Sequence, residues 1–335
     1  MYRYSCRLRA VLNSLVPCAL FVLCQGFAQA ASAPGADYPS RTIRMLVGHA
    51  PGGGTDLLAR LFGQRFTEAW GQNVIVDNRV GAGGNIASEL AARASPDGYT
   101  LLMAVSSMVI NESLYAKVNY STVRDFVPIG LSGVSTNVIA VHPSVKAQNV
   151  RELLDLAKAR PGEMTYASPG IGQASHLAME LLSTMTGLKF VHVPFNGGGP
   201  SVAAALSGQT QVLAASLPTA LPHIRSGKLR VMGVTSAKRT PLAPDLPTIA
   251  EGAGLKGYDA DVWYGLLAPA GTPAAIAGKL NAEMGRVLAL PAVKERFATL
   301  GFEPVATTPA QFGQLIRADL AKWQKVVRDA GIRAE

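Results

Sequence analysis

The sequence predicts an α/β protein of two lobes, each a mainly parallel sheet flanked by helices, with a ligand cleft between them. Short apolar strands alternate with amphipathic helical segments, and glycine-rich loops join the two. The chain has 335 residues, which exceeds the ~100 to 150 residues of an ordinary domain and favours two lobes. With 48% hydrophobic and 16% charged residues, the composition is that of a globular protein and not of a disordered chain.

The first lobe opens with an expected strand at 43–47, a glycine loop and a helix. The helix is indicated by apolar residues at helical spacing: Leu57, Leu58, Leu61, Phe62, Phe66 and Ala69. The pattern then repeats, with a strand at 74–76, a loop at 81–84, a helix from Asn85 and a strand at 100–104.

A second series of strands and helices predicts the second lobe. Its expected elements are a strand at 138–141, a helix capped by Asn149 and running to 159, a strand at 164–167, the loop SPGIGQASH leading into a helix to 185, a strand at 190–193, the loop PFNGGGP with a helix ending near 207–208, and a strand at 229–235.

The proline-rich stretch 240–259 is interpreted as the return crossing between the lobes, followed by a strand at 262–267. Two more helices begin at Thr272-Pro273 and Thr308-Pro309, and Thr308 with Gln311 forms a capping box. The last helix has one apolar stripe, which indicates core: Phe312, Leu315, Ile316, Leu320, Trp323 and Val327. The expected organisation is 31–136 with 257–335 in lobe 1, and 137–256 in lobe 2.

Residues 1–30 have the pattern of a cleavable secretory signal. Three arginines precede an apolar stretch at 11–23, and Ala28-Gln29-Ala30 forms a small-x-small cleavage site. The apolar run is shorter than the ~20 residues of a spanning helix. We therefore expect export, with lipidation at Cys24 as an alternative that the bulky Leu23 disfavours. All three cysteines lie in this segment, so the mature chain is expected to contain no disulfide.

The charge pattern gives no indication of nucleic-acid binding. Without the signal arginines the chain has 28 basic and 22 acidic residues, a net charge of +6. These charges are scattered, with no run of five or more Lys/Arg and no interleaved aromatic residues. The basic balance favours anionic solutes.

Three glycine loops precede helices and are candidate anion cradles: PGGGTD, SPGIGQASH and PFNGGGP. Strand-to-helix loops of open parallel sheets lie at the carboxyl edge, where helix N-termini present unpaired N–H groups to ligands. Each loop alone is equally explained as a tight turn with Thr55, Ser175 or Ser201 as N-cap. Three such loops in one chain favour a shared anion site.

Motifs for cofactors, metals and hydrolysis are absent from the sequence. GIGQAS has Ser175 in place of the third glycine of a dinucleotide motif, and PGGGTD lacks the Lys-Ser/Thr of a P-loop. The five histidines are widely separated, so no metal site is expected. No G-x-S-x-G elbow occurs, although Ser168, His176 and Asp56 could be combined into a triad in a distant hydrolase alternative.

Taken in order, the loops resemble those of the Bug, or TctC, family of extracytoplasmic receptors of tripartite tricarboxylate transporters. The similarity extends from Tyr38 to about Ile332. The segments that carry it are PGGGTD, DNRVGAGGNIA, PDGYTLL, YASPGIGQASH, HVPFNGGGP, LPHIRSGKLR, VTSAKRTPLAPDLPTIAE and WYGLLAPAGTP.

The resemblance implies a two-lobed Venus-flytrap fold, similar to type II periplasmic binding proteins, that closes on a small organic acid. Family ligands are di- and tricarboxylates, acidic amino acids or aromatic acids, bound through backbone N–H groups and waters without a cofactor or metal. By residue, the implied ligand contacts are Gly52, Gly53, Thr55, Asp56 and Ser106 in the first lobe, and Ser168, Gly170, Gly172, Ser175, Asn196 and Gly197 in the second. The Asp56 carboxylate and an anionic ligand would repel each other. We therefore expect Asp56 to cap its own helix or to hold a bridging water, and not to touch the anion directly.

Two departures from the family pattern concern ligand selectivity. His49 stands where the family often has an aromatic residue, and the strand end at 212–216 finishes in Ser216 where an acidic residue is common. Either change suits a more anionic or differently shaped solute, and either is equally explained by packing.

The sequence therefore predicts a monomeric periplasmic receptor without catalysis, which delivers a carboxylate to membrane permease subunits. A receptor that signals to a membrane partner remains an alternative, because both fates use the same closure. The secreted hydrolase is the more distant alternative.

Overall fold

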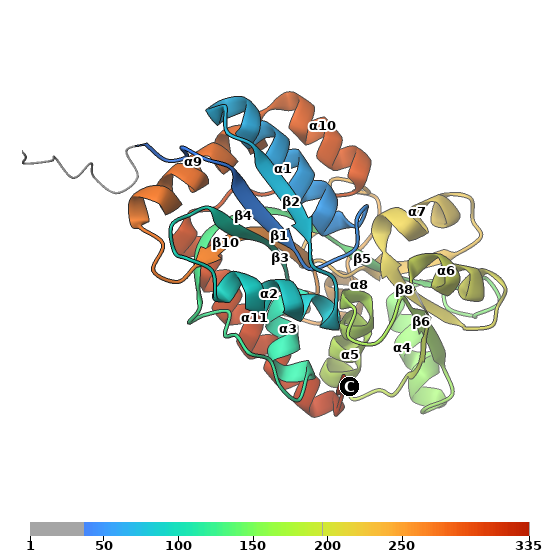
Figure 1. Ribbon diagram of the computed structural model, residues 1–335. Helices are drawn as coiled ribbons and strands as arrows, with labels where there is room; N and C mark the ends of the chain where they lie inside the picture. Colours follow the sequence, from blue (N-terminus) through green and yellow to red (C-terminus); the bar gives the residue numbers. More distant parts are fainter. Residues whose placement is uncertain (1–36, 196, 335) are drawn as a thin grey trace, which may run out of the picture. The chain divides into compact units, whose positions relative to one another are not determined.

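The structure is a computed structural model that describes residues 37–195 and 197–334. The secretory signal and Cys24 lie outside the described residues. From Asp37 onward the chain forms two β-sheets flanked by helices (Figure 1). This is the α/β architecture that the alternating strands and helices predict.

The first sheet has six strands in the order β11-β4-β10-β3-β1-β2. Their bounds are β1 Ile43–Val47, β2 Val74–Asn78, β3 Thr100–Val105, β4 Phe126–Ser135, β10 Val262–Pro269 and β11 Glu303–Pro304. The second sheet has five strands in the order β7-β6-β8-β5-β9. Their bounds are β5 Asn137–Val141, β6 Thr165–Ser168, β7 Val191–Pro194, β8 Val212–Ser216 and β9 Arg230–Val234.

Most strands of each sheet run in one direction, as the sequence analysis expected, but both sheets also contain an antiparallel strand. Strands β1, β2 and β3 are parallel, but β10 runs antiparallel between β3 and β4. In the second sheet β6, β7 and β8 are parallel, and β5 runs antiparallel between β8 and β9. Each inserted strand is the first one that the chain forms after it passes from one sheet to the other. It therefore enters from the opposite end.

The helices divide between the two faces of each sheet. Their bounds are α1 Gly54–Trp70, α2 Asn85–Ala92, α3 Ser107–Leu114, α4 Val150–Ala159, α5 Ala174–Thr186, α6 Gly198–Leu206, α7 Leu217–Arg225, α8 Ile249–Ala253, α9 Ala274–Ala289, α10 Pro291–Leu300 and α11 Pro309–Ala330. Helices α1, α9 and α10 share one core with the first sheet. Helices α2, α3 and α11 pack on its other face (Figure 1), in a core that continues to α4, α5 and α8 of the second sheet. Helices α6 and α7 close the remaining face.

The signals for helix starts at Asn149 and Thr308 are confirmed. The Asn149 side chain accepts the Glu152 N–H at 3.0 Å, and Thr308 forms a reciprocal capping box with Gln311. The predicted apolar stripe of α11 points inward, with Phe312, Ile316 and Trp323 buried. The capping box gave the predicted start of the helix, and the apolar stripe gave its buried face.

The proline-rich stretch is not a simple crossing. Residues 249–253 form α8, whose Thr248 and Glu251 make a capping box and whose Ile249 is buried with the second-sheet core. The passage back to the first sheet occurs later, where Ala260 donates its N–H to the Thr235 carbonyl before β10 begins. Sequence reasoning also gave no prediction for β4, α3, α7 or α10.

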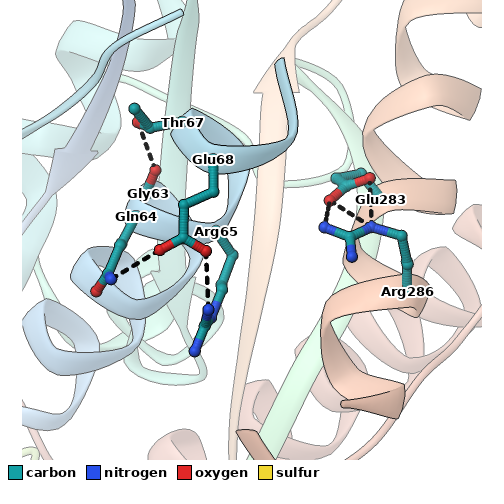
Figure 2. Close-up of polar contacts among 7 residues, drawn as sticks. All are labelled: Gly63, Gln64, Arg65, Thr67, Glu68, Glu283 and Arg286. Carbon is teal, nitrogen blue, oxygen red and sulfur yellow. Dashed lines mark hydrogen bonds and ion pairs between the residues drawn. The ribbon is translucent and has the colours of Figure 1, made fainter. Parts of the chain in front are cut away.

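Helices α1 and α9 carry short-range charge pairs on their outer faces (Figure 2). Arg65 Nη1 lies 2.8 Å from Glu68, and Arg286 Nη2 lies 2.5 Å from Glu283. Such exposed pairs contribute about 0 to 1 kcal/mol each, so they do not determine the fold. Within residues 37–195 and 197–334, no helix combines the length and apolarity needed to cross a membrane.

Candidate ligand-binding site

Every predicted ligand contact that the structure describes lies just beyond, or at the last residue of, a parallel strand. His49 and the segment 52–56 follow β1, and Ser106 follows β3. In the second sheet Ser168 and Ser216 end β6 and β8, and Gly197 follows β7. Asn196 lies outside the described residues. The carboxyl edge of parallel strands is where open α/β sheets bind ligands, so the fold gives these loops the expected setting.

The Asp56 side chain stabilises the first loop through hydrogen bonds within the protein. Its carboxylate accepts hydrogen bonds from the Gly52 N–H at 2.9 Å, Arg60 Nε at 2.9 Å and Asn78 Nδ2 at 3.0 Å. Burial alone would raise the pKa of Asp56, but these hydrogen bonds, led by that from Arg60, hold the pKa below its usual value. The side chain is 2% exposed. Asp56 is therefore an ionised group that holds the loop from inside. The expectation that it caps its own helix is wrong, because Gly53 is the N-cap of α1 and the Asp56 carboxylate accepts the N–H of Gly52, which precedes the helix.

The loop glycines use their own N–H groups internally. Gly52 donates to Asp56, and Gly53 donates to the Ala50 carbonyl at 3.2 Å. In the second sheet Gly170 donates to Ser168 Oγ at 3.2 Å and Gly197 to the Pro169 carbonyl at 3.0 Å. Gly52 and Gly197 have φ of +82° and +108°, which explains the need for glycine there. The glycines shape the loops.

The helices that follow these loops lack side-chain caps. The N-cap residues are Gly53 for α1, Gln173 for α5 and Gly197 for α6, and none makes a side-chain cap hydrogen bond. The alternative that Thr55, Ser175 and Ser201 act as N-caps is thus wrong, because all three residues lie within the first turns. The first-turn N–H groups of a helix have no intrahelical acceptor. These three N-termini are consequently left ready to bind an anion.

A small pocket of about 10 Å³ lies at the carboxyl ends of β1 and β3. Its lining includes His49, Ser107 and the close-packed glycines Gly48, Gly83 and Gly84. A Cβ on Gly48 would lie 2.7 Å from the Gly84 Cα, so glycine is required for this approach. Sequence reasoning named His49 but missed Ser107, Gly83 and Gly84 as lining. The glycine pair after β2 and the serine pair after β3 were the available signals.

Two polar atoms of the pocket lining have no partner. His49 Nδ1 and Ser107 Oγ are buried, and neither makes a hydrogen bond within the described residues. Burial lowers the pKa of His49, so the imidazole is uncharged at neutral pH. None of the other ten lining residues is ionisable. The pocket is therefore polar without being charged, and its unmet hydrogen-bonding atoms favour a polar occupant.

The loops of the second sheet contact one another. Phe195 donates its N–H to the Ser168 carbonyl at 3.0 Å, joining the ends of β6 and β7. Ser216 Oγ lies 2.6 Å from Thr219 Oγ1, and a Cβ on Gly198 would lie 3.4 Å from Thr219 Cγ2. The loop at Gly172 packs closely against Leu114 at the end of α3, since a Cβ on Gly172 would lie 2.5 Å from Leu114 Cδ2. Gly172 thus allows the second-sheet loop to reach the first sheet.

The residues of the hydrolase alternative are not brought together. Ser168 Oγ lies 2.6 Å from His192 Nε2, and His176 accepts the Gly172 N–H instead. Asp56 lies in α1, beside the first sheet, where it accepts a hydrogen bond from Arg60. Ser168 is 0% exposed, so its hydroxyl is closed to a substrate. Across the described part of the chain, no group of three or more His, Cys, Asp or Glu residues is placed to hold a metal ion.

Comparison with known proteins identifies the family. The model of the tripartite tricarboxylate transporter family receptor matches residues 58–332. The chain belongs to this family. The receptor is 36% identical over 316 residues to the protein BugT of Bordetella pertussis, covering 94% of this chain and 96% of BugT. The Bug/TctC resemblance drawn from the loops is confirmed.

Several solved structures are similar to the receptor, and two of them contain a carboxylate. Rpa4515 of R. palustris, solved with adipate, is 34% identical with a TM-score of 0.74 over 88% of this chain and 99% of that one. MatC of Rhodopseudomonas palustris, solved with malate, is 31% identical with a TM-score of 0.71 over 87% and 100%. The periplasmic binding protein BugD is 33% identical, with a TM-score of 0.72 over 89% and 100%. The receptor is a solute-binding protein with their two-lobed fold.

Proposed function

We propose that the receptor captures a small carboxylate in the periplasm, without catalysis, and delivers it to the permease subunits of a tripartite tricarboxylate-type transporter. The signal at 1–30 would export the chain, and the mature protein would act as a monomer. The solute would be a di- or tricarboxylate, an acidic amino acid or an aromatic acid.

The observation that carries this proposal is the set of uncapped helix N-termini at the carboxyl edges of both sheets. Helices α1, α5 and α6 begin there at N-cap residues without a side-chain cap bond. A hydrogen bond to a charged group is worth ~1.5 to 3 kcal/mol, so three or four N–H groups supply the ~8 kcal/mol of a micromolar complex before ordering costs. A carboxylate needs no arginine clamp in such a site.

The relatives narrow the ligand class. Adipate and malate, held by two solved relatives, are both dicarboxylates. A dicarboxylate could place one carboxylate at the first-sheet loop and the other at the second-sheet loops. Residues 31–136 with 257–335 would then act as one lobe and 137–256 as the other, closing on the ligand.

Selectivity would come from side chains around the helix N-termini. His49 and Ser107 each offer an unpartnered polar atom in the first-sheet pocket, and Ser216 adds a hydroxyl at the end of β8. An uncharged imidazole and a hydroxyl can both donate and accept, whereas a carboxylate can only accept. This pair would therefore favour an acid that carries a hydroxyl or amide group, and His49→Phe would reduce that preference.

Calorimetric titration of the mature protein with malate, adipate, citrate, aspartate and benzoate tests the proposal. We expect at least one acid to bind with a micromolar or lower Kd. Gly53→Val should abolish that binding, since its Cβ would lie 3.3 Å from the Ala50 carbonyl oxygen and crowd the loop at the α1 N-terminus.

The matched control is Gly278→Val, on an exposed part of α9 where a Cβ meets nothing within 4 Å. It should bind as wild type does. Full affinity in Gly53→Val, or no binding by any acid of the panel, would contradict the proposal.

A further inference from the structure

Behind the second-sheet loop lies a cluster of aromatic and titratable side chains, in which Tyr166 and His176 are buried and His192 and Glu180 are partly buried. The imidazoles of His176 and His192 stack with ring centroids 4.0 Å apart and planes inclined by 11°. The Tyr166 ring lies nearly parallel to that of His192, with centroids 4.8 Å apart. These residues come from α5, β7 and β6, so the cluster joins three elements at the carboxyl edge of the sheet.

Each imidazole makes a hydrogen bond to the loop in front of it. His176 Nδ1 accepts the Gly172 N–H at 3.0 Å. His192 Nε2 lies 2.6 Å from Ser168 Oγ, and that oxygen accepts the Gly170 N–H at 3.2 Å. The backbone of 168–172 is thus tied to the two rings at both of its ends.

Glu180 contacts both His176 and Tyr166 and holds their rings in place. Glu180, one turn along α5, lies 3.6 Å from His176 Nε2 and accepts a 2.6 Å hydrogen bond from the Tyr166 hydroxyl. Nδ1 of His176 is an acceptor, so its proton sits on Nε2 and faces Glu180. Burial lowers the pKa of His176 to about 3, assisted by His192, and that of His192 to about 4. Glu180 is the charged group that faces them, and burial raises its pKa.

We propose that His176 and His192 are positioning residues, which hold segment 168–172 in the shape that presents the α5 N-terminus to the ligand. This inference rests on the proposed function, because it assumes that α5 binds a carboxylate. Gly170 and Gly172 have φ of +148° and +74°, so the loop adopts backbone conformations that glycine allows and other residues rarely adopt. Without His176, the Gly172 N–H loses its acceptor and the loop shifts away from the end of α3.

Paired substitutions separate positioning from bulk packing. His176→Asn places an amide oxygen close to the position of Nδ1 and keeps an acceptor for Gly172, whereas His176→Leu fills the space without one. With malate and adipate as probes, we expect affinity within about 3-fold of wild type for His176→Asn and a loss of 10-fold or more for His176→Leu. His142→Leu, which removes an imidazole hydrogen-bonded to Ser144 after β5, is the control and should bind normally.

A measurement on ligand-free protein keeps the inference testable if His176→Leu folds poorly. Long-range ¹H–¹⁵N spectra of wild-type protein should show His176 protonated at Nε2 only at pH 7, and hydrogen exchange should show a protected Gly172 amide. His192→Gln, which keeps a polar group near Nε2, should retain both features and bind the probes within about 3-fold of wild type.

Three results would overturn the inference: a proton on His176 Nδ1 at pH 7, an unprotected Gly172 amide, or equal affinities of His176→Leu and His176→Asn. If wild-type protein binds no acid of the panel, the proposed function fails and the inference fails with it. Normal binding by wild type with unchanged binding by His176→Leu would refute the inference alone.

Discussion

Replacing Asp56 with alanine should destabilise the protein strongly, because its carboxylate holds the first loop from inside. The substitution leaves the Gly52 N–H without its acceptor and leaves the Asn78 amide with the His49 carbonyl alone. Each hydrogen bond to a charged group contributes about 1.5 to 3 kcal/mol. The bond to Arg60, whose side chain is 53% exposed, adds at most about 1 kcal/mol. We therefore expect the free energy of unfolding to fall by about 3 to 7 kcal/mol.

Urea denaturation, followed by far-UV circular dichroism, measures this loss. Arg60→Ala is the matched control, since it keeps the Gly52 and Asn78 donors on Asp56 and should cost about 1 kcal/mol or less. Ligand affinity is measured on the same variants under conditions where both remain folded. A loss below 1 kcal/mol for Asp56→Ala would refute the internal role. Lost binding at unchanged stability would mean that Asp56 contacts the ligand instead.

Two further predictions concern Asp261, which precedes β10, and the contact of Gly301 with α7. Burial, followed by the charge of Asp259, raises the pKa of Asp261 to about 7, and its Oδ1 has no partner within the described residues. The folded state therefore holds this proton more tightly than the unfolded state, so stability falls as pH rises from about 4 to about 7. Asp261→Asn should remove that loss and be more stable than wild type by about 1 to 4 kcal/mol at pH 8, with little difference at pH 4; equal pH–stability curves would contradict this. Gly301→Ala places a Cβ 2.0 Å from Pro218 Cγ of α7, at a φ of +78°. We expect it to lower the melting temperature by more than the control Gly331→Ala, where φ is similar and a Cβ would meet nothing within 4 Å. Equal shifts in melting temperature would show that the close approach to Pro218 is unimportant.

The elements that the sequence predicted are those with a local signal. The apolar spacing of α1 and α11, and the caps at Asn149 and Thr308, were sufficient to locate those helices. Strand β4 was missed because it contains Pro128, Gly130 and Gly133 and so lacks a β-rich pattern. Its glycines fit close neighbours: a Cβ on Gly133 would lie 2.7 Å from the Glu303 carbonyl oxygen. That requirement comes from tertiary contacts, which no local pattern reveals.

Strand direction was also beyond local reasoning. Strands β5 and β10 have apolar runs like those of the parallel strands, and only their position after a passage between sheets makes them antiparallel. In the same way, helix α8 is five residues long within a proline-rich stretch, and its burial against the second-sheet core defines it.

The candidate site was predictable in position more than in its hydrogen bonds. The glycine loops identified the carboxyl edges correctly because glycine before a helix has a local cause. The partners of Asp56 and His176 were unpredictable in detail, since Asn78 lies 22 residues from Asp56 and His192 lies 16 from His176. Ser107 was overlooked because α3, which begins at this residue, was not predicted; its hydroxyl is buried in the pocket without a partner among the described residues.

Native mass spectrometry of gently purified mature protein tests the central claim most directly. The account predicts a bound mass that corresponds to a small organic acid, released on gentle activation, and the same acid added back should raise the melting temperature of stripped protein. A clean unliganded mass, together with no melting shift from any acid of the panel, would contradict the claim that the helix N-termini of this receptor bind a carboxylate.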